Sequence, residues 1–361
     1  MALSNRAKWV ASIVLTLVMI LIILLLTEAA VRVRHAMKYG DMPTVEDTFR
    51  VDQSIGLRVP VAGLEAGPIR INSLGFRGEE IPRDKPDNTL RIAFLGASTT
   101  YCAEVSGNDM TWPALVTEQL KERFPGRGFD YINGGVPGYS VASSIKNLKH
   151  RVAPLKPDVV VIYHATNDLA YETRQLAANA GIYEIPKQAG RSWLARQSLL
   201  WELVEKNLAI MAAQHSADSE AARLDFKPEQ VGGEFGGDLD QLVKEAKQVA
   251  GRVILVTFAH QLRPEQSAEV QAKAAASALY YMPFMTPDAL LRGYQRFNNI
   301  IRETAEGNHI LLVDGEDAIP GDNEHFNDAV HFKDAGSQAQ ARRVVEAMLA
   351  DPLTLKMLKG D

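Results

Sequence analysis

Two segments, far apart in the chain, hold the side chains that a serine nucleophile requires. Ser98 lies in LRIAFLGASTT (residues 90–100), where an apolar run ends in a glycine and small hydroxyl residues. Such a run is typical of a strand that presents a reactive group at its carboxyl end, and it is also typical of a strand before a helix cap. His331 and Asp328 stand together in NDAVHF (residues 327–332). We expect Ser98 to be the nucleophile, His331 its general base and Asp328 the carboxylate that orients the imidazole.

Ester hydrolysis through a serine also requires hydrogen-bond donors for the oxyanion that forms in the transition state. We expect three donors, the backbone amides of Ser98 and Gly135 and the side-chain amide of Asn167. Gly135 and Asn167 each stand at the end of an apolar run, as Ser98 does. Because the carboxyl ends of parallel strands meet at one edge of a sheet, we expect all three residues in one crevice.

The segments that must position these residues alternate between two patterns. Short apolar runs predict strands, and helical spacing of apolar residues between them predicts helices. This alternation favours a doubly wound, mostly parallel α/β sheet of five strands. The predicted strands are 91–95, 129–136, 159–163, 252–258 and 309–313, and the predicted helices include 112–120, 143–155, 239–250, 287–307 and 337–349.

Two longer segments interrupt the alternation, and we interpret them as insertions at about 169–237 and 259–285. Insertions after the carboxyl end of a strand often form lids and substrate walls. The second contains the aromatic cluster Tyr280, Tyr281 and Phe284, which could stack on a sugar ring or an acyl chain, or form the core of a lid.

The N-terminal region predicts a membrane anchor. No charged residue occurs from Trp9 to Thr27, which is close to the ~20 residues that a helix needs to cross a bilayer. A cleaved signal peptide is the alternative, but its apolar region is usually shorter, and no persuasive cleavage site follows. We therefore divide the chain into an anchor with a juxtamembrane helix (1–40), a stem (41–70) and a catalytic domain (71–361).

Composition excludes several classes of protein. The net charge is −5, and no basic face or reader motif indicates a nucleic-acid partner. The single cysteine, Cys102, excludes an intramolecular disulfide framework, and without a paired base we expect it to serve packing. We expect no metal and no cofactor, and the sequence gives no basis for an oligomeric state.

Four sequence blocks resemble those of the SGNH (GDSL-type) hydrolases, in the order Ser, Gly, Asn, His. The blocks are GASTT (96–100), NGGVPG (133–138), ATND (165–168) and DAVH (328–331). The resemblance implies a flavodoxin-like, three-layer α/β/α fold and an esterase mechanism without a metal. Two departures, Ala97 where the family name has Asp and Ala165 where Gly is usual, remove no catalytic group.

The resemblance extends to a bacterial branch with an N-terminal membrane anchor and a catalytic domain outside the cytoplasm. It implies a single-pass protein of the inner membrane that faces the periplasm. We expect a serine esterase that removes or transfers a small acyl group, such as acetyl, on a cell-envelope carbohydrate. The alternatives are a lipid esterase or thioesterase, and a non-catalytic scaffold that binds polysaccharide.

Overall fold

The computed structural model describes residues 5–39, 48–184, 192–218 and 223–360. Its contacts divide the chain into two compact units, the first formed by residues 1–42 and 186–212 and the second by 43–185 and 213–361. Part of the predicted stem (41–47) and two pieces of the first predicted insertion (185–191 and 219–222) lie outside the described residues.

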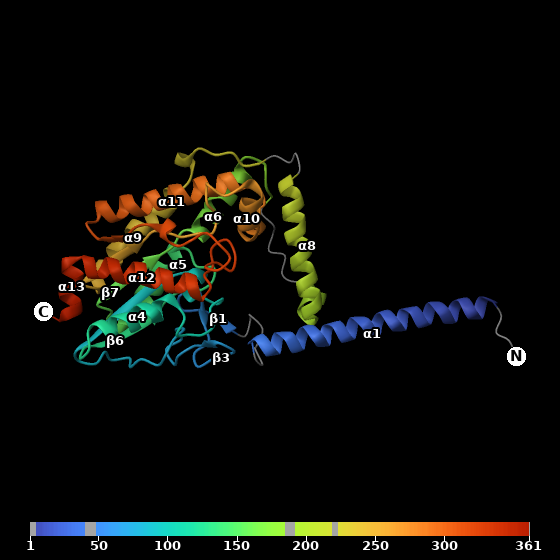
Figure 1. Cartoon of the computed structure of the whole chain (residues 1–361), viewed down its shortest axis with the longest axis horizontal. Helices are drawn as coiled ribbons and strands as arrows, with labels where there is room; N and C mark the ends of the chain where they lie inside the picture. Colours follow the sequence, from blue (N-terminus) through green and yellow to red (C-terminus); the bar gives the residue numbers. More distant parts are fainter. Residues whose placement is uncertain (1–4, 40–47, 185–191, 219–222, 361) are drawn as a thin grey trace. The chain divides into compact units, whose positions relative to one another are not determined.

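The second unit is built on a five-stranded parallel sheet (Figure 1). Its strand order is β6-β5-β7-β8-β9, so the first strand of the sheet lies between the second and the third. This is the flavodoxin-like order. Successive strands are added on one side of β5 and then on the other, and the point between β5 and β7 where the order switches is the usual position of a binding crevice. The strands are β5 (Thr89–Gly96), β6 (Gly128–Asn133), β7 (Val159–Tyr163), β8 (Arg252–Val256) and β9 (Leu311–Val313).

Helices cover both faces of this sheet, which gives the expected three layers (Figure 1). Every residue of β7 is buried, because a parallel sheet between two helical layers leaves neither face of its central strands in water. One face carries α4 (Trp112–Arg123), α12 (Asp334–Ala350) and α13 (Pro352–Lys359). The other carries α5 (Val141–Asn147), α9 (Gly233–Val249) and α11 (Pro287–Gly307).

The helix predicted over 143–155 is shorter than expected. α5 ends at Asn147 and is followed by a π-helical turn (Leu148–Val152) and a 3-10 turn (Ala153–Leu155). Pro154 has no N–H to donate to the carbonyl of the preceding turn, so regular helical bonding cannot continue through it.

The two predicted insertions both contain regular helices. α6 (Thr166–Asn179) begins directly after β7, so the first insertion does not interrupt the chain at residue 169. The second insertion contains α10 (Ala268–Tyr281), whose first turn is capped by the side chain of Ser267.

The described part of the stem folds against the catalytic unit as two small hairpins. Leu57 and Val59 of β2 are buried against Ala97, Val136 and Tyr139, so this hairpin supports the turn that precedes Ser98. The hairpins are β1 (Phe49–Asp52) with β2 (Leu57–Pro60), and β3 (Glu65–Ala66) with β4 (Ile69–Arg70).

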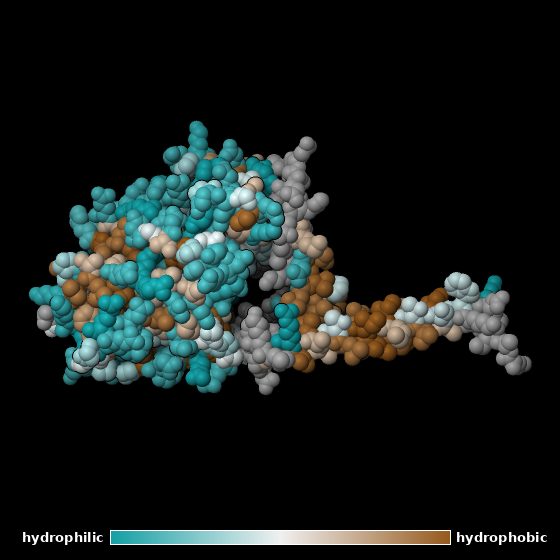
Figure 2. Space-filling model, viewed as in Figure 1, coloured by the Kyte–Doolittle hydropathy of each residue, from teal (hydrophilic) through white to brown (hydrophobic). Residues whose placement is uncertain are grey.

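The first unit contains the long helix α1 (Asn5–Tyr39). Within it, residues Ala11–Arg34 are long and apolar enough to cross a membrane, with a mean hydropathy of 2.8 and none of the segment buried. Figure 2 shows apolar side chains along this helix. An N-terminal signal sequence can meet the same criterion of length and hydropathy. The unit also contains α7 (Trp193–Gln197) and the first part of α8 (Leu199–Asp218).

Candidate active site

Ser98 is the first residue of a four-residue helix, α3 (Ser98–Tyr101), that follows β5 without a loop. The turn is tight because the backbone N–H groups of Thr100 and Tyr101 both donate to the carbonyl of Ala97. Gly96 is required there, since a Cβ would lie 2.0 Å from Thr100 Oγ1. The strand therefore ends with the side chain of Ser98 partly exposed at the sheet edge.

The structure brings together the three residues that the sequence proposes for proton transfer. His331 Nε2 lies 2.8 Å from Ser98 Oγ. On the other side of the ring, His331 Nδ1 lies 2.9 Å and 2.8 Å from the two carboxylate oxygens of Asp328. The serine hydroxyl, the imidazole and the carboxylate therefore form one continuous hydrogen-bonded chain.

A closed loop holds Asp328 and His331 in this arrangement. Asp328 Oδ1 accepts hydrogen bonds from the backbone N–H groups of Val330 and His331, each at 3.0 Å. The backbone N–H of Asn327 donates to the carbonyl of His331, and Phe326 and Phe332 form an antiparallel bridge across the loop base. Three-residue spacing thus lets the carboxylate bind both the backbone of the turn and the imidazole.

The charges of Asp328 and of protonated His331 stabilise each other. Burial would raise the pKa of the Asp328 carboxyl, but hydrogen bonds from His331 and from the loop backbone hold that pKa below its ordinary value. Burial would lower the pKa of His331, but the hydrogen bond to Asp328 and the charges of Glu104 and Asp328 hold it above its ordinary value. An imidazolium formed during catalysis is therefore stabilised by the site itself.

Glu104 is a part of this environment that the sequence analysis missed. Burial raises the pKa of its carboxyl, which also interacts with the charges of His331 and Asp328. In the described part of the chain, its Oε2 is buried without a hydrogen-bond partner. The loop that carries Glu104 is tied to the start of α12, which follows the histidine loop, because the backbone N–H of Ser106 donates to Asp334 Oδ1 at 2.8 Å. Glu104 stands in no recognisable motif, so only the fold indicates it.

Two of the three expected oxyanion donors are free to act. None of the described residues accepts a hydrogen bond from the backbone N–H of Ser98. The side-chain nitrogen of Asn167 donates one hydrogen bond to the carbonyl of Tyr139 at 2.8 Å, and an amide nitrogen carries a second hydrogen.

The expectation for Gly135 needs correction. Its backbone N–H donates to the side-chain oxygen of Asn133 at 3.1 Å, and the residue is buried. A Cβ there would lie 2.5 Å from the backbone nitrogen of Tyr101, so Gly135 allows the chain to pack behind the nucleophile turn. Because its amide is already bonded, Gly135 does not have the geometry of an oxyanion donor.

Among the described residues, Gly138 has the unpaired backbone amide that was expected of Gly135. It is exposed, has a φ of +85°, and lines the same cavity as Asn167. No described residue accepts a hydrogen bond from its backbone N–H. The Pro137-Gly138 pair is a turn signal that could have identified it, because a glycine after proline commonly takes positive φ.

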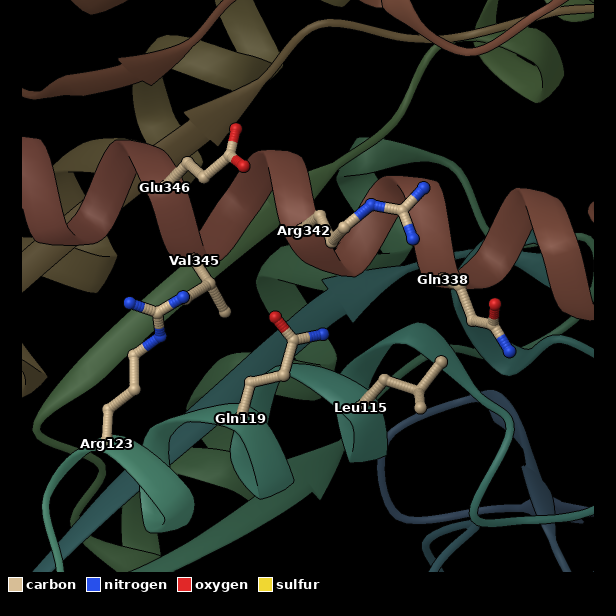
Figure 3. A pocket seen from close by; sticks show the side chains of 7 residues that line it. All are labelled: Leu115, Gln119, Arg123, Gln338, Arg342, Val345 and Glu346. Atoms are coloured by element: carbon tan, nitrogen blue, oxygen red, sulfur yellow. The ribbon is translucent and has the colours of Figure 1, made fainter.

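One of the hollows on the second unit adjoins the candidate site. This cavity, of about 450 Å³, is lined by Gly138 and Asn167 and by residues of α6 and α9. Another, of about 330 Å³, is lined by side chains of α4 and α12 (Figure 3). Neither lining contains Ser98, Asp328 or His331, but the first contains Asn167, so the first cavity is the candidate substrate pocket.

The thiol of Cys102 takes no part in this arrangement. It is buried, and burial raises its pKa to about 12. The thiolate, which is the reactive form, is therefore strongly disfavoured, and Cys102 serves packing as the sequence predicts.

Comparison with known proteins identifies the family. The GDSL-like lipase/acylhydrolase family matches residues 94–339, a span that contains Ser98, Asn167, Asp328 and His331. The chain belongs to this family. This GDSL-like acylhydrolase is therefore an ester hydrolase, and the resemblance seen in its four sequence blocks is confirmed.

Solved structures similar to this GDSL-like acylhydrolase include Axe2, an acetylxylan esterase from Geobacillus stearothermophilus, at 18% identity with a TM-score of 0.44, covering 72% of this chain and 93% of Axe2. Another is the lipase/acylhydrolase from Enterococcus faecalis, at 16% identity with a TM-score of 0.42, covering 72% of this chain and 95% of that protein. None of the curated proteins matches the chain by sequence.

Proposed function

We propose that this ester hydrolase acts through an acyl-enzyme on Ser98. The observation that carries the proposal is the hydrogen-bonded chain from Ser98 through His331 to Asp328. Ser98 Oγ attacks the ester carbonyl carbon while His331 Nε2 takes its proton. When the tetrahedral intermediate collapses, the C–O bond to the alcohol breaks, and His331 returns the proton to the leaving oxygen. Asp328 holds the imidazolium throughout.

The acyl group then leaves Ser98 by the reverse chemistry. His331 takes a proton from water or from a sugar hydroxyl, and that oxygen attacks the acyl carbonyl. Water yields a hydrolase and a sugar hydroxyl yields a transferase. We assign the oxyanion donors to the backbone N–H groups of Ser98 and Gly138 and to the side chain of Asn167, since none of these hydrogens has a partner within the described chain.

The proposed substrate is a small acyl ester, such as an acetyl ester, on a cell-envelope carbohydrate. The cavity beside Asn167 supports it, because charged and hydroxyl side chains line the cavity and suit a sugar better than a long acyl chain. A lipid esterase or thioesterase would need an apolar tunnel for the chain. A non-catalytic scaffold is disfavoured by the complete proton-transfer chain.

We further propose that α1 anchors the enzyme as a single-pass protein of the inner membrane, with the catalytic unit facing the periplasm. The apolar segment Ala11–Arg34 supports the anchor, because its side chains are exposed and would otherwise face water. An anchored enzyme would reach esters on polymers close to the membrane surface.

The experiment that tests the reaction uses the full-length protein in detergent and p-nitrophenyl esters of increasing chain length. We expect hydrolysis to be fastest with acetyl and to disappear in Ser98→Ala. A fluorophosphonate probe should label the wild type once per chain and leave Ser98→Ala unlabelled. Folded protein that neither hydrolyses esters nor takes up the probe would overturn the mechanism.

A further inference from the structure

The cavity beside Asn167 is strongly acidic. Asp168, Glu172, Glu234 and Asp238 line it, from α6 and α9, and Arg174 is the one cationic residue of its lining. Such an excess of carboxylates next to an ester-cleaving site bears on the substrate. The inference below rests on the proposed function.

The four carboxylates differ in how far the protein itself satisfies them. Glu172 accepts hydrogen bonds from two backbone N–H groups at the start of α9, those of Gly232 and Phe235, so its charge caps that helix. Glu234 and Asp238, one turn apart on α9, have no hydrogen bond or ion pair with any residue that the structure describes. These two groups are free to meet a ligand.

Asp168 is more deeply buried than the other three carboxylates. Only 6% of the residue is exposed, and one carboxylate oxygen accepts a hydrogen bond from the backbone N–H of Val141 at 3.0 Å. The other oxygen, Oδ2, is inaccessible and has no hydrogen-bond partner among the described residues. It lies 4.0 Å from Nδ1 of the buried His164. Burial, reinforced by the charges of Asp238 and Glu172, raises the pKa of Asp168 to about 7. Asp168 therefore lines the cavity without offering this oxygen to a ligand.

Two tyrosines complete the lining. Tyr171 is 50% exposed and Tyr281 is 60% exposed, and both belong to the cavity wall. The Nη2 of Arg174 is directed to the carbonyl of Tyr281 at 3.4 Å, so part of its hydrogen-bonding capacity is already used. Exposed aromatic rings beside carboxylates are suited to a sugar, whose ring stacks while its hydroxyls donate hydrogen bonds.

A metal ion is a poor alternative occupant. Across the described ranges, no group of three or more His, Cys, Asp and Glu side chains is arranged to hold one. The carboxylates are therefore left to recognise an organic ligand.

We propose that this cavity selects sugar rings without a carboxylate or phosphate, and that it prefers rings carrying a free amine. The carboxylates accept hydrogen bonds from hydroxyl or ammonium groups, and charge-assisted bonds of this kind are about twice as strong as neutral ones. A uronate or a phosphorylated sugar would place a negative charge beside Glu234 and Asp238, and like charges in a partly buried site repel.

Binding to the full-length Ser98→Ala protein in detergent tests the proposal, with affinities measured by calorimetry. The probes are oligomers of equal length of glucosamine, glucose and galacturonate, at a pH where the amine is protonated. We expect the glucosamine oligomer to bind most tightly and the galacturonate oligomer at least about tenfold more weakly than the glucose oligomer, which corresponds to ~1.4 kcal/mol.

The double variant Glu234→Gln/Asp238→Asn, in the Ser98→Ala protein, should reduce both affinity differences, that between the glucosamine and glucose oligomers and that between the glucose and galacturonate oligomers. The matched control, Asp87→Asn/Glu122→Gln, removes the same charge from exposed positions outside the cavity and should keep the wild-type order. Galacturonate binding as tight as glucose, no binding of any oligomer, or an order unchanged in the double variant would overturn the proposal. If the wild type does not hydrolyse p-nitrophenyl acetate, the proposed function is overturned. The binding result is judged separately from that outcome.

A second, independent observation concerns the first unit. Glu28 is the first charged residue after the apolar run 9–27, and its carboxylate caps the N-terminus of α8. It accepts hydrogen bonds from the backbone N–H groups of Leu199 and Leu200, at 3.1 Å and 2.9 Å, and from Ser198 Oγ at 2.7 Å. One turn further, Arg32 donates to the carbonyl of Gln197 at 3.1 Å.

Apolar side chains of α7 and α8 are exposed beside this junction. Trp193 is 67% exposed and Trp201 is 41% exposed, and Leu194 and Leu203 are similarly open. Glu28 is the first charged residue within the segment Ala11–Arg34 and lies near its C-terminal end. Side chains tied to it would lie at the depth of the lipid headgroups, where tryptophan is enriched.

The geometry points to α7 and the start of α8 as a second membrane contact, lying in the headgroup region of the bilayer that α1 spans. This inference rests on the proposed anchor. The headgroup region gives the exposed tryptophans an amphipathic environment, and the hydrogen bonds from α8 to Glu28 fix their distance from the hydrocarbon.

The test uses the full chain in phospholipid vesicles whose acyl chains carry bromine, which quenches tryptophan fluorescence on contact. In a Trp9→Phe background, we expect strong quenching from Trp193 and Trp201, because the remaining Trp112 is buried in the core. Adding Trp193→Phe and Trp201→Phe should abolish the quenching. Equal quenching with and without these two tryptophans would overturn the inference, whereas failure of the chain to float with vesicles would overturn the anchor.

Discussion

The side-chain nitrogen of Asn167 donates a hydrogen bond to the carbonyl oxygen of Tyr139 over 2.8 Å. This bond fixes the plane of the amide, so the second hydrogen of the same nitrogen keeps a defined direction. Asn167 also lines the cavity that we assign to the substrate. A donor held in place before the reaction stabilises an oxyanion without reorganisation, which is the condition for a large effect on rate.

Asn167→Ala should therefore reduce kcat by roughly 10²–10³, the range seen when one oxyanion donor is removed. KM should change little, since the donor acts on charge that develops in the transition state. Steady-state hydrolysis of p-nitrophenyl acetate checks this. A loss confined to KM would mean that Asn167 binds the ground state.

Asp328→Asn should reduce kcat by about 10⁴, because an amide can hold the imidazole in the tautomer that cannot accept the serine proton. The double variant Ser98→Ala/His331→Ala should be no less active than Ser98→Ala alone, since these residues act as one unit. Additive losses in the double variant would contradict a shared proton-transfer chain.

Activity should fall as the pH falls through the pKa of His331. Only the neutral imidazole can take the serine proton, and Asp328 and Glu104 hold the pKa of His331 above its ordinary 6.5. Glu104→Gln removes one stabilising charge, so the pKa of His331 should fall and the acid limb of kcat/KM should move to lower pH. Glu122→Gln, an exposed change on α4, should leave the limb in place. An unshifted limb in Glu104→Gln would mean that its charge does not reach the histidine.

Most of the fold and the proton-transfer chain could be predicted from the sequence, because both depend on local patterns. Apolar runs at Val159–Tyr163 and elsewhere identify buried strands, and Asp328 reaches His331 through a turn of only three residues. Glu104 could not be predicted, since its position near His331 depends on how two distant loops pack. The irregular turns between Asn147 and Pro154 also escaped prediction, because the helical spacing of apolar residues continues through them.

The sequence also could not decide which of two glycines, Gly135 or Gly138, supplies the backbone oxyanion donor. Gly135 and Gly138 both follow β6 within a few residues, and spacing alone does not decide which amide faces the substrate. The decision depends on the side-chain oxygen of Asn133, which accepts a hydrogen bond from the backbone N–H of Gly135. That contact is set by the packed structure and leaves the amide of Gly138 as the free donor.

Alanine substitutions of these two glycines should impair the enzyme in different ways, through stability at Gly135 and through catalysis at Gly138. In Gly135→Ala, the new Cβ would meet the backbone of the nucleophile turn at 2.5 Å, so we expect a loss of stability of at least about 1–3 kcal/mol, as for other overpacked cores. In Gly138→Ala, the nearest atom is the Arg58 side chain at 3.4 Å, and the strain is that of a positive φ, roughly 1–3 kcal/mol.

The readouts separate structure from catalysis. Gly135→Ala should lower the thermal unfolding midpoint strongly, while the fraction that remains folded keeps much of the wild-type kcat. Gly138→Ala should lower the midpoint less and reduce kcat more, because relief of its strain turns the N–H away from the oxyanion. Active-site titration with a fluorophosphonate normalises each kcat to folded enzyme. If Gly135→Ala instead loses kcat at an unchanged midpoint, the amide of Gly135 must rotate to meet the substrate, and our assignment to Gly138 is wrong.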